Sequence, residues 1–211
     1  MEKLKLKSIS PDLYPSSAHL VAASFFDNPA HIYLCPDAQT RIEQLTWLLG
    51  VNLKLQLNLG AESFCIADNS TVRAMGFWTK PNEVKVGLTE KIRGGLLKVP
   101  FKMGWTGFKR VLEVSAGIEN HLVKTMGNTQ PYRYLNNMVI QEDMRGKGLG
   151  ANILEKQFAA IQATEKDAIF ALSTQRYWTV KFYERLGFEV LLEEKIGQGD
   201  LAFTNWTMRK I

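Results

Sequence analysis

The sequence predicts a mixed α/β fold on three observations. Seven short runs rich in β-branched and apolar residues have strand length, and most are separated by segments with apolar residues at helical spacing. The 211 residues are 45% hydrophobic and 22% charged, which suits one sizeable buried core. No internal repeat, low-complexity tract or linker divides the sequence. We therefore predict a single domain over residues 1–211.

The first part of the chain is predicted to hold a strand, two helices and a hairpin. Residues 2–9 alternate Lys with Leu or Ile, which indicates a half-buried strand at a sheet edge. One helix is predicted over residues 11–26, ended by Asn28-Pro29, and a second from Asp37 to about Asn58. Strands at 61–67 and 71–79 are joined by residues whose composition is typical of a tight turn.

Residues 83–130 are the least regular part of the sequence. Basic residues alternate there with aliphatic and aromatic ones, and an apparent helix runs from Gly107 to about Met126. The aromatic side chains of this segment either wall a pocket or pack a small satellite core; they include Phe101, Trp105 and Phe108.

The last third alternates strands with helices. A strand is predicted over 132–141, a helix from Gly150 onward, and a strand over 168–174 whose continuous apolar run suits burial on both faces. A helix over 177–186 ends at Gly187. Strands at 188–194 and 201–209 form a final antiparallel ribbon.

A glycine-rich turn, RGKGLG at residues 145–150, lies between the 132–141 strand and the following helix. Glycines allow close approach to the backbone, and the amides at a helix N-terminus attract phosphate or pyrophosphate. A Walker turn is excluded because Lys147 is followed by Gly148 instead of Ser or Thr. A Rossmann fingerprint is excluded because the next strand ends without an acidic residue, in Ser173, Thr174 and Gln175.

A second motif, FYERLGF at residues 182–188, follows this turn after a helix and a strand. In this order the two motifs resemble those of the GCN5-related N-acetyltransferase (GNAT) superfamily, over about residues 132–209. The C-terminal part, FYERLGFEV and NWTMRK, is similar to the branch that contains puromycin N-acetyltransferase. The resemblance implies the acyl-CoA N-acyltransferase fold. That fold is a mixed, mostly antiparallel sheet of about seven strands flanked by helices, and residues 83–130 would be a helical insertion between the third and fourth strands.

The resemblance also implies a binding site for acetyl-CoA. The backbone amides of the turn would hold the pyrophosphate; they belong to Arg145, Gly146, Lys147, Gly148, Leu149, Gly150 and Ala151. The preceding strand would bulge, diverge from the next strand, and pair with the pantetheine arm through Met138, Val139 and Ile140. One of these N–H groups would stabilise the oxyanion. Arg176 occupies a position where many relatives carry Asn, and it either contacts a CoA phosphate or stays solvated.

Tyr183, in the second motif, would protonate the departing thiolate. An unperturbed tyrosine has a pKa near ~10 and needs no tuning for this role. The general base is open. The 132–141 strand offers Asn136 and Asn137, which are poor bases, while Glu119 and His121 near the end of the insertion helix are candidates for the base or surface groups. The amine could also lose its proton to water before attack.

The sequence therefore predicts an acetyl-CoA-dependent N-acyltransferase. We expect it to move the acetyl group to a primary amine of a small molecule, by direct attack in a ternary complex. A covalent acetyl-cysteine route is disfavoured because neither Cys35 nor Cys65 falls in a motif. The alternatives are a protein N-acetyltransferase and a non-catalytic acyl-CoA-binding or sensor module.

Composition limits the other partners. The net charge of +5 and pI of about 9.1 fit an anionic ligand such as CoA, or a face of solvated lysines. We expect no nucleic acid because no dense basic run alternates with aromatics, and no metal because His, Cys and carboxylates lack ligand spacing. The chain lacks a predicted signal peptide or membrane span, and its two cysteines lack CxxC spacing, so a cytoplasmic protein is expected. Acyl-chain preference and assembly as a homodimer stay open.

Overall fold

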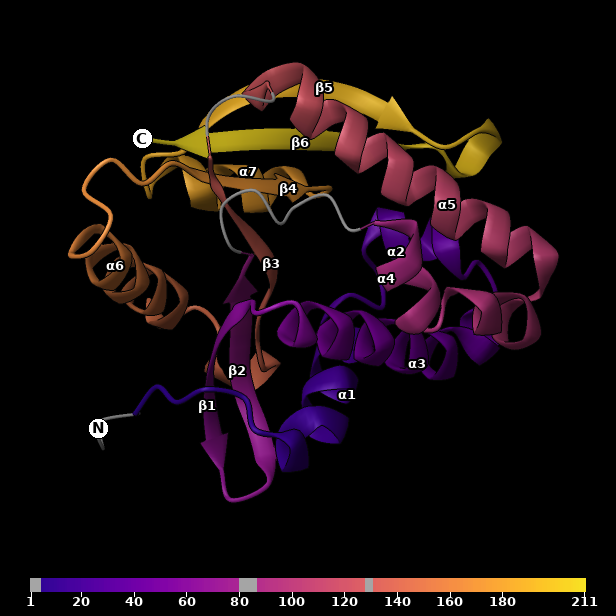
Figure 1. The fold of residues 1–211 in the computed structure, drawn as a ribbon, viewed down its shortest axis with the longest axis horizontal. Coiled ribbons are helices and arrows are strands. Elements are labelled where there is room, and N and C mark those ends of the chain that lie inside the picture. The colour runs from indigo at the N-terminus through magenta and orange to yellow at the C-terminus, as the bar shows by residue number, and fades with distance from the viewer. Residues whose placement is uncertain (1–4, 80–86, 128–130) are drawn as a thin grey trace.

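A computed structural model describes residues 5–79, 87–127 and 131–211 (Figure 1). In these residues six strands form one sheet in the order β1-β2-β3-β4-β6-β5, in which only the β3–β4 pair is parallel. The strands are β1 Glu62–Asp68, β2 Thr71–Trp78, β3 Arg133–Ile140, β4 Phe170–Thr174, β5 Glu189–Ile196 and β6 Phe203–Lys210. The predicted mixed, mostly antiparallel sheet flanked by helices is confirmed.

Four of the predicted helices lie close to their expected positions, a fifth begins earlier than expected, and two short helices, at Pro29–Leu34 and Leu88–Arg93, were not predicted as separate helices. The helices are α1 Tyr14–Ser24, α2 Pro29–Leu34, α3 Ala38–Asn58, α4 Leu88–Arg93, α5 Val99–Met126, α6 Leu149–Gln162 and α7 Tyr177–Glu184. Asp37 caps α3, because its side-chain oxygen accepts a hydrogen bond from the Gln39 N–H at 3.0 Å. The first helix already ends at Ser24, with Phe25 as its C-cap, and Asn28 and Pro29 instead begin α2, with Asn28 as the cap and Pro29 in the first turn.

The prediction of about seven strands was wrong by one. Of residues 2–9, the structure describes residues 5–9, and only Lys7 pairs with the sheet, through a single antiparallel bridge to Cys65. The backbone N–H of Ile9 then donates to the Ser63 hydroxyl at 3.0 Å instead of to a strand carbonyl. This segment lies beside β1 but leaves it too soon to form a strand.

The segment between β2 and β3 is helical, as predicted, but α5 begins at Val99 and not near Gly107. The helix kinks at Gly104, which has φ 70° and ψ 172°. Phe101 and Trp105 are 89% and 71% exposed, so they neither wall a pocket nor pack a core. Residues 83–86 and 128–130 of the predicted insertion lie outside the described residues.

Alternate residues of the strands enter two hydrophobic clusters, one on each face of the sheet. Met75 and Phe77 of β2 pack with residues of α1, α2, α3 and α5, whereas Ala74 and Trp78 pack with residues of α6 and α7. The Trp78 ring lies 5.3 Å from that of Phe170, between ring centroids. Figure 1 shows α6 on one side of β3 and α1 and α3 on the other.

The centre of the sheet opens at β3. Its parallel pairing with β4 is confined to Arg133 and Tyr134, opposite Phe170 and Ala171. Against β2, Asn136 and Val139 pair with Phe77 and Met75, so Asn137 and Met138 both lie opposite Gly76. Asn137 has φ 51°, as in a β-bulge. The divergence and the bulge that the resemblance implied are both present, with the bulge inside the strand and not at its end.

None of the helices in the described ranges is both long and apolar enough to cross a membrane. Cys35 and Cys65 are buried and reduced.

Candidate active site

The RGKGLG turn forms a backbone cradle at the C-terminal end of β3. Gly146 and Gly148 have φ of 75° and 72°, a region that glycine adopts without strain, and no heavy atom lies within 4 Å of where their Cβ would be. Gly148 is the N-cap of α6, so the amides of Leu149, Gly150 and Ala151 belong to the first turn and have no partner within the helix. This geometry fits a pyrophosphate.

The basic side chains of the turn fold back onto the protein. The Nε–H of Arg145 donates to the Ile140 carbonyl at 2.8 Å, and one of its NH2 groups donates to the Ser24 hydroxyl at 3.3 Å. Lys147 Nζ donates to the Asp143 carbonyl at 2.9 Å. The backbone amides are therefore the groups that the turn presents outward, with the two cations close by.

The turn, β3 and α7 surround a cleft of about 650 Å³. Its lining includes most of the residues predicted to bind acetyl-CoA, namely Met138, Val139, Ile140, Arg145, Gly146, Gly148, Leu149, Gly150 and Ala151, and also Tyr183. Lys147 and Arg176 are outside this lining. The fold thus brings Tyr183 next to the end of β3 and the turn that follows it, from which it is far away in the sequence.

Sequence reasoning missed the other residues that line this cleft, namely Met144, Glu155, Thr179, Phe182, Arg185 and Leu186. Thr179, Phe182 and Leu186 belong to the helix that carries Tyr183 or to its C-terminal end, and their spacing of three or four residues places them beside it. That spacing could have identified them. Gly150 allows this packing, since a Cβ there would lie 3.1 Å from Ile140 Cδ1 and 3.4 Å from Phe182 Cζ.

Tyr183 is fixed and desolvated. Its side chain is 7% exposed, and its ring centroid lies 5.1 Å from that of Phe182 and 5.5 Å from that of Phe188. Burial raises the pKa of Tyr183, and interaction with the Tyr134 phenol raises it further. The expectation of an unperturbed tyrosine was wrong. The hydroxyl stays protonated at neutral and mildly alkaline pH.

Arg176 lies at the N-terminus of α7, with its guanidinium carbon 5.2 Å from the centroid of the Trp178 ring. Its Nε is buried, and burial lowers the pKa of this guanidinium. The residue as a whole is half-buried, so a partly solvated arginine also stays open. Contact with a CoA phosphate stays a prediction.

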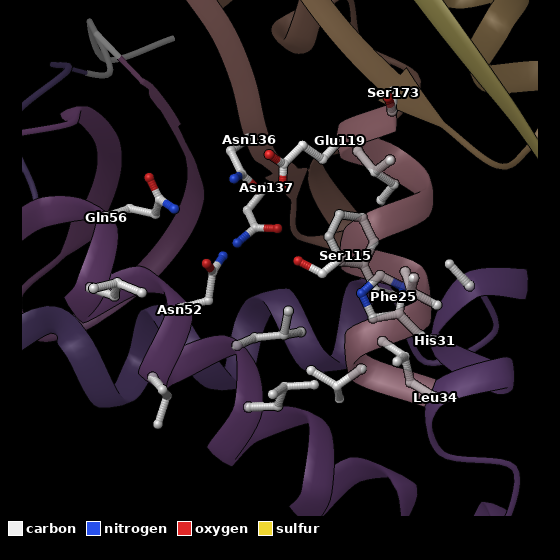
Figure 2. A pocket seen from close by; sticks show the side chains of 18 of the residues that line it. Phe25, His31, Leu34, Asn52, Gln56, Ser115, Glu119, Asn136, Asn137 and Ser173 are labelled. Carbon is white, nitrogen blue, oxygen red and sulfur yellow. The ribbon is translucent and has the colours of Figure 1, made fainter. Parts of the chain in front are cut away.

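A second cavity, of about 380 Å³, lies among α2, α3, α5, β3 and the end of β4. Figure 2 shows the Glu119 carboxylate pointing towards Asn136 and Asn137 and the Asn52 amide on the other side of Asn137, whereas His31 lies apart from them, beside Phe25 and Leu34. The apolar lining comes mainly from α3 and α5 and includes Leu48, Val51, Leu55, Val111, Val114 and Ile118. Sequence reasoning did not predict this cavity.

The two candidate bases have different surroundings. Glu119 is half-buried and lines the second cavity. His121 lines neither cavity and is 7% exposed, so the surface location expected for it was wrong. Its Nδ1 accepts a hydrogen bond from the Asn205 amide at 3.1 Å, and its Nε2 lies 3.4 Å from Glu194 Oε2. These contacts give His121 a structural role.

The two cavities adjoin at the bulge of β3. Tyr134, Asn136 and Asn137 line the second cavity, whereas the cleft beside the turn begins with the next residue, Met138. The arrangement can place two substrates on either side of one strand, with their reacting groups at the point where β3 diverges from β4.

Known proteins share this sequence pattern and this fold. A family model described as an acetyltransferase (GNAT) domain matches residues 114–210. A Corynebacterium glutamicum protein described as "histone acetyltransferase HPA2 and related acetyltransferase" is 16% identical, with a TM-score of 0.62 over 98% of this chain and 94% of that one. Arylalkylamine N-acetyltransferase 2 from Aedes aegypti is 14% identical, with a TM-score of 0.59 over 100% and 99%.

A third similar structure is the polyamine N-acetyltransferase of Drosophila melanogaster, at 10% identity and a TM-score of 0.56 over 97% of this chain and 98% of that one. At these identities the solved structures establish the fold, and the family model adds the sequence pattern. Residues 114–210 therefore match the acetyltransferase (GNAT) domain family, and the whole chain has the fold of the similar acetyltransferase structures.

Proposed function

We propose that the protein transfers the acetyl group of acetyl-CoA to a primary amine of a small molecule, by direct attack in a ternary complex. The observation that carries this proposal is the adjoining of two cavities at consecutive residues of β3, Asn137 and Met138. One cavity has a backbone cradle suited to pyrophosphate, and the other has a carboxylate and amides suited to an amine.

Acetyl-CoA supplies an activated acetyl thioester, and the lining of the cleft fits it. The amides from Gly146 to Ala151 would hold the pyrophosphate, whereas the Arg145 N–H donates to the Glu142 carbonyl at 3.1 Å. The edge of β3 that faces β4 has no strand partner beyond Tyr134 in the described sheet. An N–H group in the segment Met138–Ile140 can therefore donate to the thioester carbonyl oxygen as negative charge develops on it.

Tyr183 would give the proton that the departing sulfur requires. Its hydroxyl is protonated at neutral pH because burial raises its pKa, and its ring is held between Phe182 and Phe188. A fixed, protonated donor is suited to general acid catalysis.

Glu119 is the residue we propose on the amine side. Its carboxylate points into the second cavity towards Asn136 and Asn137 (Figure 2). A carboxylate attracts the ammonium form of an acceptor, and it can accept the proton, directly or through water, that the amine loses. The two asparagine amides can orient the amine but cannot serve as bases.

A small acceptor is favoured over a protein because the second cavity is a concave space of about 380 Å³ within the size range of small-molecule sites. Two of the similar structures are enzymes named for arylalkylamine and polyamine acetylation, and a third is named for histones, which keeps a protein acceptor as the alternative. A cytoplasmic location and placement in the puromycin N-acetyltransferase branch stay part of this proposal.

Release of free thiol from acetyl-CoA tests the proposal when it is measured with and without primary amines. An acetyltransferase gives amine-dependent release. A non-catalytic acyl-CoA sensor would be stabilised by acetyl-CoA in thermal unfolding and yet release no thiol with any amine. Peptides with a free N-terminus or a lysine, assayed alongside, separate the protein-acetyltransferase alternative.

A further inference from the structure

The exposed apolar side chains of the protein are concentrated in one short stretch of the chain. Ten large hydrophobic residues are exposed among those that the structure describes, and five of the ten fall within residues 92–112: Ile92, Leu97, Phe101, Trp105 and Leu112. Single exposed apolar residues are ordinary, whereas a group of them marks an interaction surface. Figure 1 shows the start of α5 at the end of the molecule farthest from α6, where a large partner can reach it.

Beyond the kink at Gly104, the exposed residues lie along one side of α5. Trp105, Phe108 and Leu112 have the spacing i, i+3 and i+7, which places them on the same side of a regular helix. The rings of Trp105 and Phe108 meet edge to face, with their centroids 5.9 Å apart. Val114 lies on the opposite side and is buried in the core. The helix is thus held to the protein by its inner side, and packing within the chain does not account for the apolar outer side.

The same stretch is strongly basic. Residues 92–112 contain five Lys or Arg and no Asp or Glu. Arg110 is directed towards the protein, since its guanidinium carbon lies 5.3 Å from the centroid of the Tyr33 ring. The other four cations are exposed, and together with the five exposed apolar residues they form what we call the basic–apolar surface: Arg93, Lys98, Lys102 and Lys109.

We propose that the basic–apolar surface binds a membrane surface that contains anionic lipids. Lys and Arg are attracted to anionic headgroups, while Trp, Phe, Leu and Ile side chains are buried at the boundary between headgroups and acyl chains. Binding of this kind takes place at the membrane surface and needs no spanning helix. The inference is independent of the proposed acetyl transfer.

The chemistry of the surface favours this partner over two others. A two-fold contact with a second copy of the chain would bring the same cations of both copies together, and like charges repel. A nucleic acid would pair with the cations and stack on the aromatic rings, but it offers no apolar phase for the aliphatic Ile92, Leu97 and Leu112. An anionic lipid surface complements both the charges and the aliphatic side chains.

Co-sedimentation of the whole chain with lipid vesicles tests the inference. Vesicles of phosphatidylcholine mixed with phosphatidylglycerol should bind the protein at least ~10-fold more tightly than vesicles of phosphatidylcholine alone. Added salt should weaken the binding, because it screens the attraction between the cations and the headgroups. Equal affinity for the two kinds of vesicle, or no binding to the anionic ones, would overturn the inference.

A pair of double variants tests the aromatic residues. Phe101→Ser combined with Trp105→Ser should weaken binding to the anionic vesicles by at least ~10-fold. Tyr177→Ser combined with Trp178→Ser removes two exposed aromatic side chains from α7 and should leave vesicle binding unchanged. If both double variants bind as the unmodified protein does, or lose the same affinity, the aromatic side chains of α5 are not the contact and the inference fails.

A pair of triple variants tests the cations in the same way. Replacing three lysines of the surface by Gln should weaken vesicle binding by at least ~10-fold; they are Lys98, Lys102 and Lys109. The control replaces three exposed lysines outside the surface, namely Lys5, Lys156 and Lys166, and removes the same net charge. All six side chains are exposed, so the variants should unfold at the same temperature as the unmodified protein. A loss of affinity that is the same in both triple variants would reduce the effect to net charge and contradict a specific surface.

Fluorescence quenching and two competing measurements complete the test. Lipids brominated on their acyl chains should quench the unmodified protein more than Trp105→Phe, because Trp105 would lie at the acyl boundary. Equal quenching would place Trp105 outside the membrane and overturn the inference. Tighter binding to duplex DNA than to anionic vesicles would assign the surface to nucleic acid instead. A dimer that Phe101→Ser combined with Trp105→Ser converts to a monomer would assign it to a second copy of the chain.

Discussion

Asn137 and Met138 are consecutive residues of β3, yet they line different cavities. Both lie opposite Gly76 of β2, because the bulge places two residues of β3 against one. In a regular strand, successive side chains alternate between the two faces of the sheet. Here the extra residue, Asn137 with φ 51°, interrupts that alternation, so that Asn136 and Asn137 both line the second cavity while Met138 lines the cleft, at the point where β3 has separated from β4. The bulge is therefore the feature that joins the two candidate substrate sites.

Gly76→Ala should disturb this junction. A Cβ at residue 76 would lie 2.6 Å from Phe64 Cζ and 3.3 Å from Met138 Sδ, so a neighbour must shift. We expect a loss of about 1–3 kcal/mol in the free energy of unfolding, measured by urea denaturation, with lower thiol release. Phe64→Leu should restore part of the stability in the double variant. Full stability and activity in Gly76→Ala alone would show that the strand does not need glycine there.

Tyr183→Phe should lower kcat by ~10²–10⁴-fold while leaving acetyl-CoA affinity nearly unchanged. The ring stays packed between Phe182 and Phe188, and only the donated proton is lost. Steady-state thiol release and thermal shift by acetyl-CoA measure the two effects separately. Tyr177→Phe is the matched control, since Tyr177 lies on the same helix and is 60% exposed. Equal losses of turnover and affinity in Tyr183→Phe would refute the general-acid role.

Gly148→Glu should abolish acetyl-CoA binding. The side chain has room, since no atom lies within 4 Å of the added Cβ, but the new carboxylate would occupy the position proposed for the pyrophosphate. The φ of 72° adds strain of about 1–3 kcal/mol for a residue with a side chain. Gly199→Glu is the control, because Gly199 has φ 64° with similar room and lies outside the cleft. Thermal shift by acetyl-CoA should persist in the control and vanish in Gly148→Glu; a normal shift in both would exclude the cradle.

Glu119→Gln should lower kcat/KM for the amine by at least ~100-fold, because the amide cannot accept the amine proton and carries no charge. Acetyl-CoA should stabilise the variant as well as it stabilises the unmodified protein. Glu193→Gln, at an exposed position of β5, controls for the loss of one negative charge. Unchanged kcat/KM in Glu119→Gln would leave water as the proton acceptor and remove Glu119 from the mechanism.

His31 should make the protein less stable in mild acid. Its ring stacks on Phe25 with ring centroids 4.8 Å apart, its buried Nδ1 has no hydrogen-bond partner among the residues that the structure describes, and burial lowers its pKa to about 3. Between pH 6.5 and 3 the unfolded chain binds a proton at His31 that the folded protein does not. The contribution of the neutral His31 ring to the free energy of unfolding is therefore complete above pH 6.5. It is lost as the pH falls below that value, by up to ~1.4 kcal/mol per pH unit.

Urea denaturation at pH 7 and pH 5 measures this dependence. His31→Phe should lose less stability than the unmodified protein between the two pH values, because the aromatic stack remains but nothing titrates. His19→Phe, at an exposed position of α1, should not reduce the loss. The same slope in all three proteins would assign the pH dependence to other groups.

The sequence predicted the backbone geometry of the candidate cofactor side because that side consists of local features. Six consecutive residues specify the cradle, since glycines and a helix start determine its backbone whatever surrounds it. Tyr183 lies on a short helix whose apolar spacing already fixes its buried face. The number of residues between the strand and the turn was enough to predict which strand residues line the cleft, namely Met138, Val139 and Ile140. The expected divergence of β3 from β4 is present, since only two residue pairs connect these strands.

The acceptor side could not be predicted in the same way. Its cavity depends on how α3, α5 and β3 pack together, and no spacing within one element encodes the distance between elements. Glu119 and His121 illustrate the difficulty. They are two residues apart on α5 and were equivalent from sequence, but one faces the cavity and the other contacts Asn205 and Glu194. Phe101 and Trp105 are a further example, because their aromatic side chains suggest burial and yet both are exposed.

The most direct test of the central claim is the rate of thiol release from acetyl-CoA, measured at several concentrations of hexylamine and of acetyl-CoA. The two-cavity arrangement predicts that thiol release needs both substrates, because acetyl-CoA and the amine must be bound together, one on each side of β3, before they react. Double-reciprocal plots of the rate should therefore give lines that intersect. Stabilisation by acetyl-CoA without release by hexylamine, 2-phenylethylamine or the amine-bearing peptides would contradict an acetyltransferase centred on this bulge.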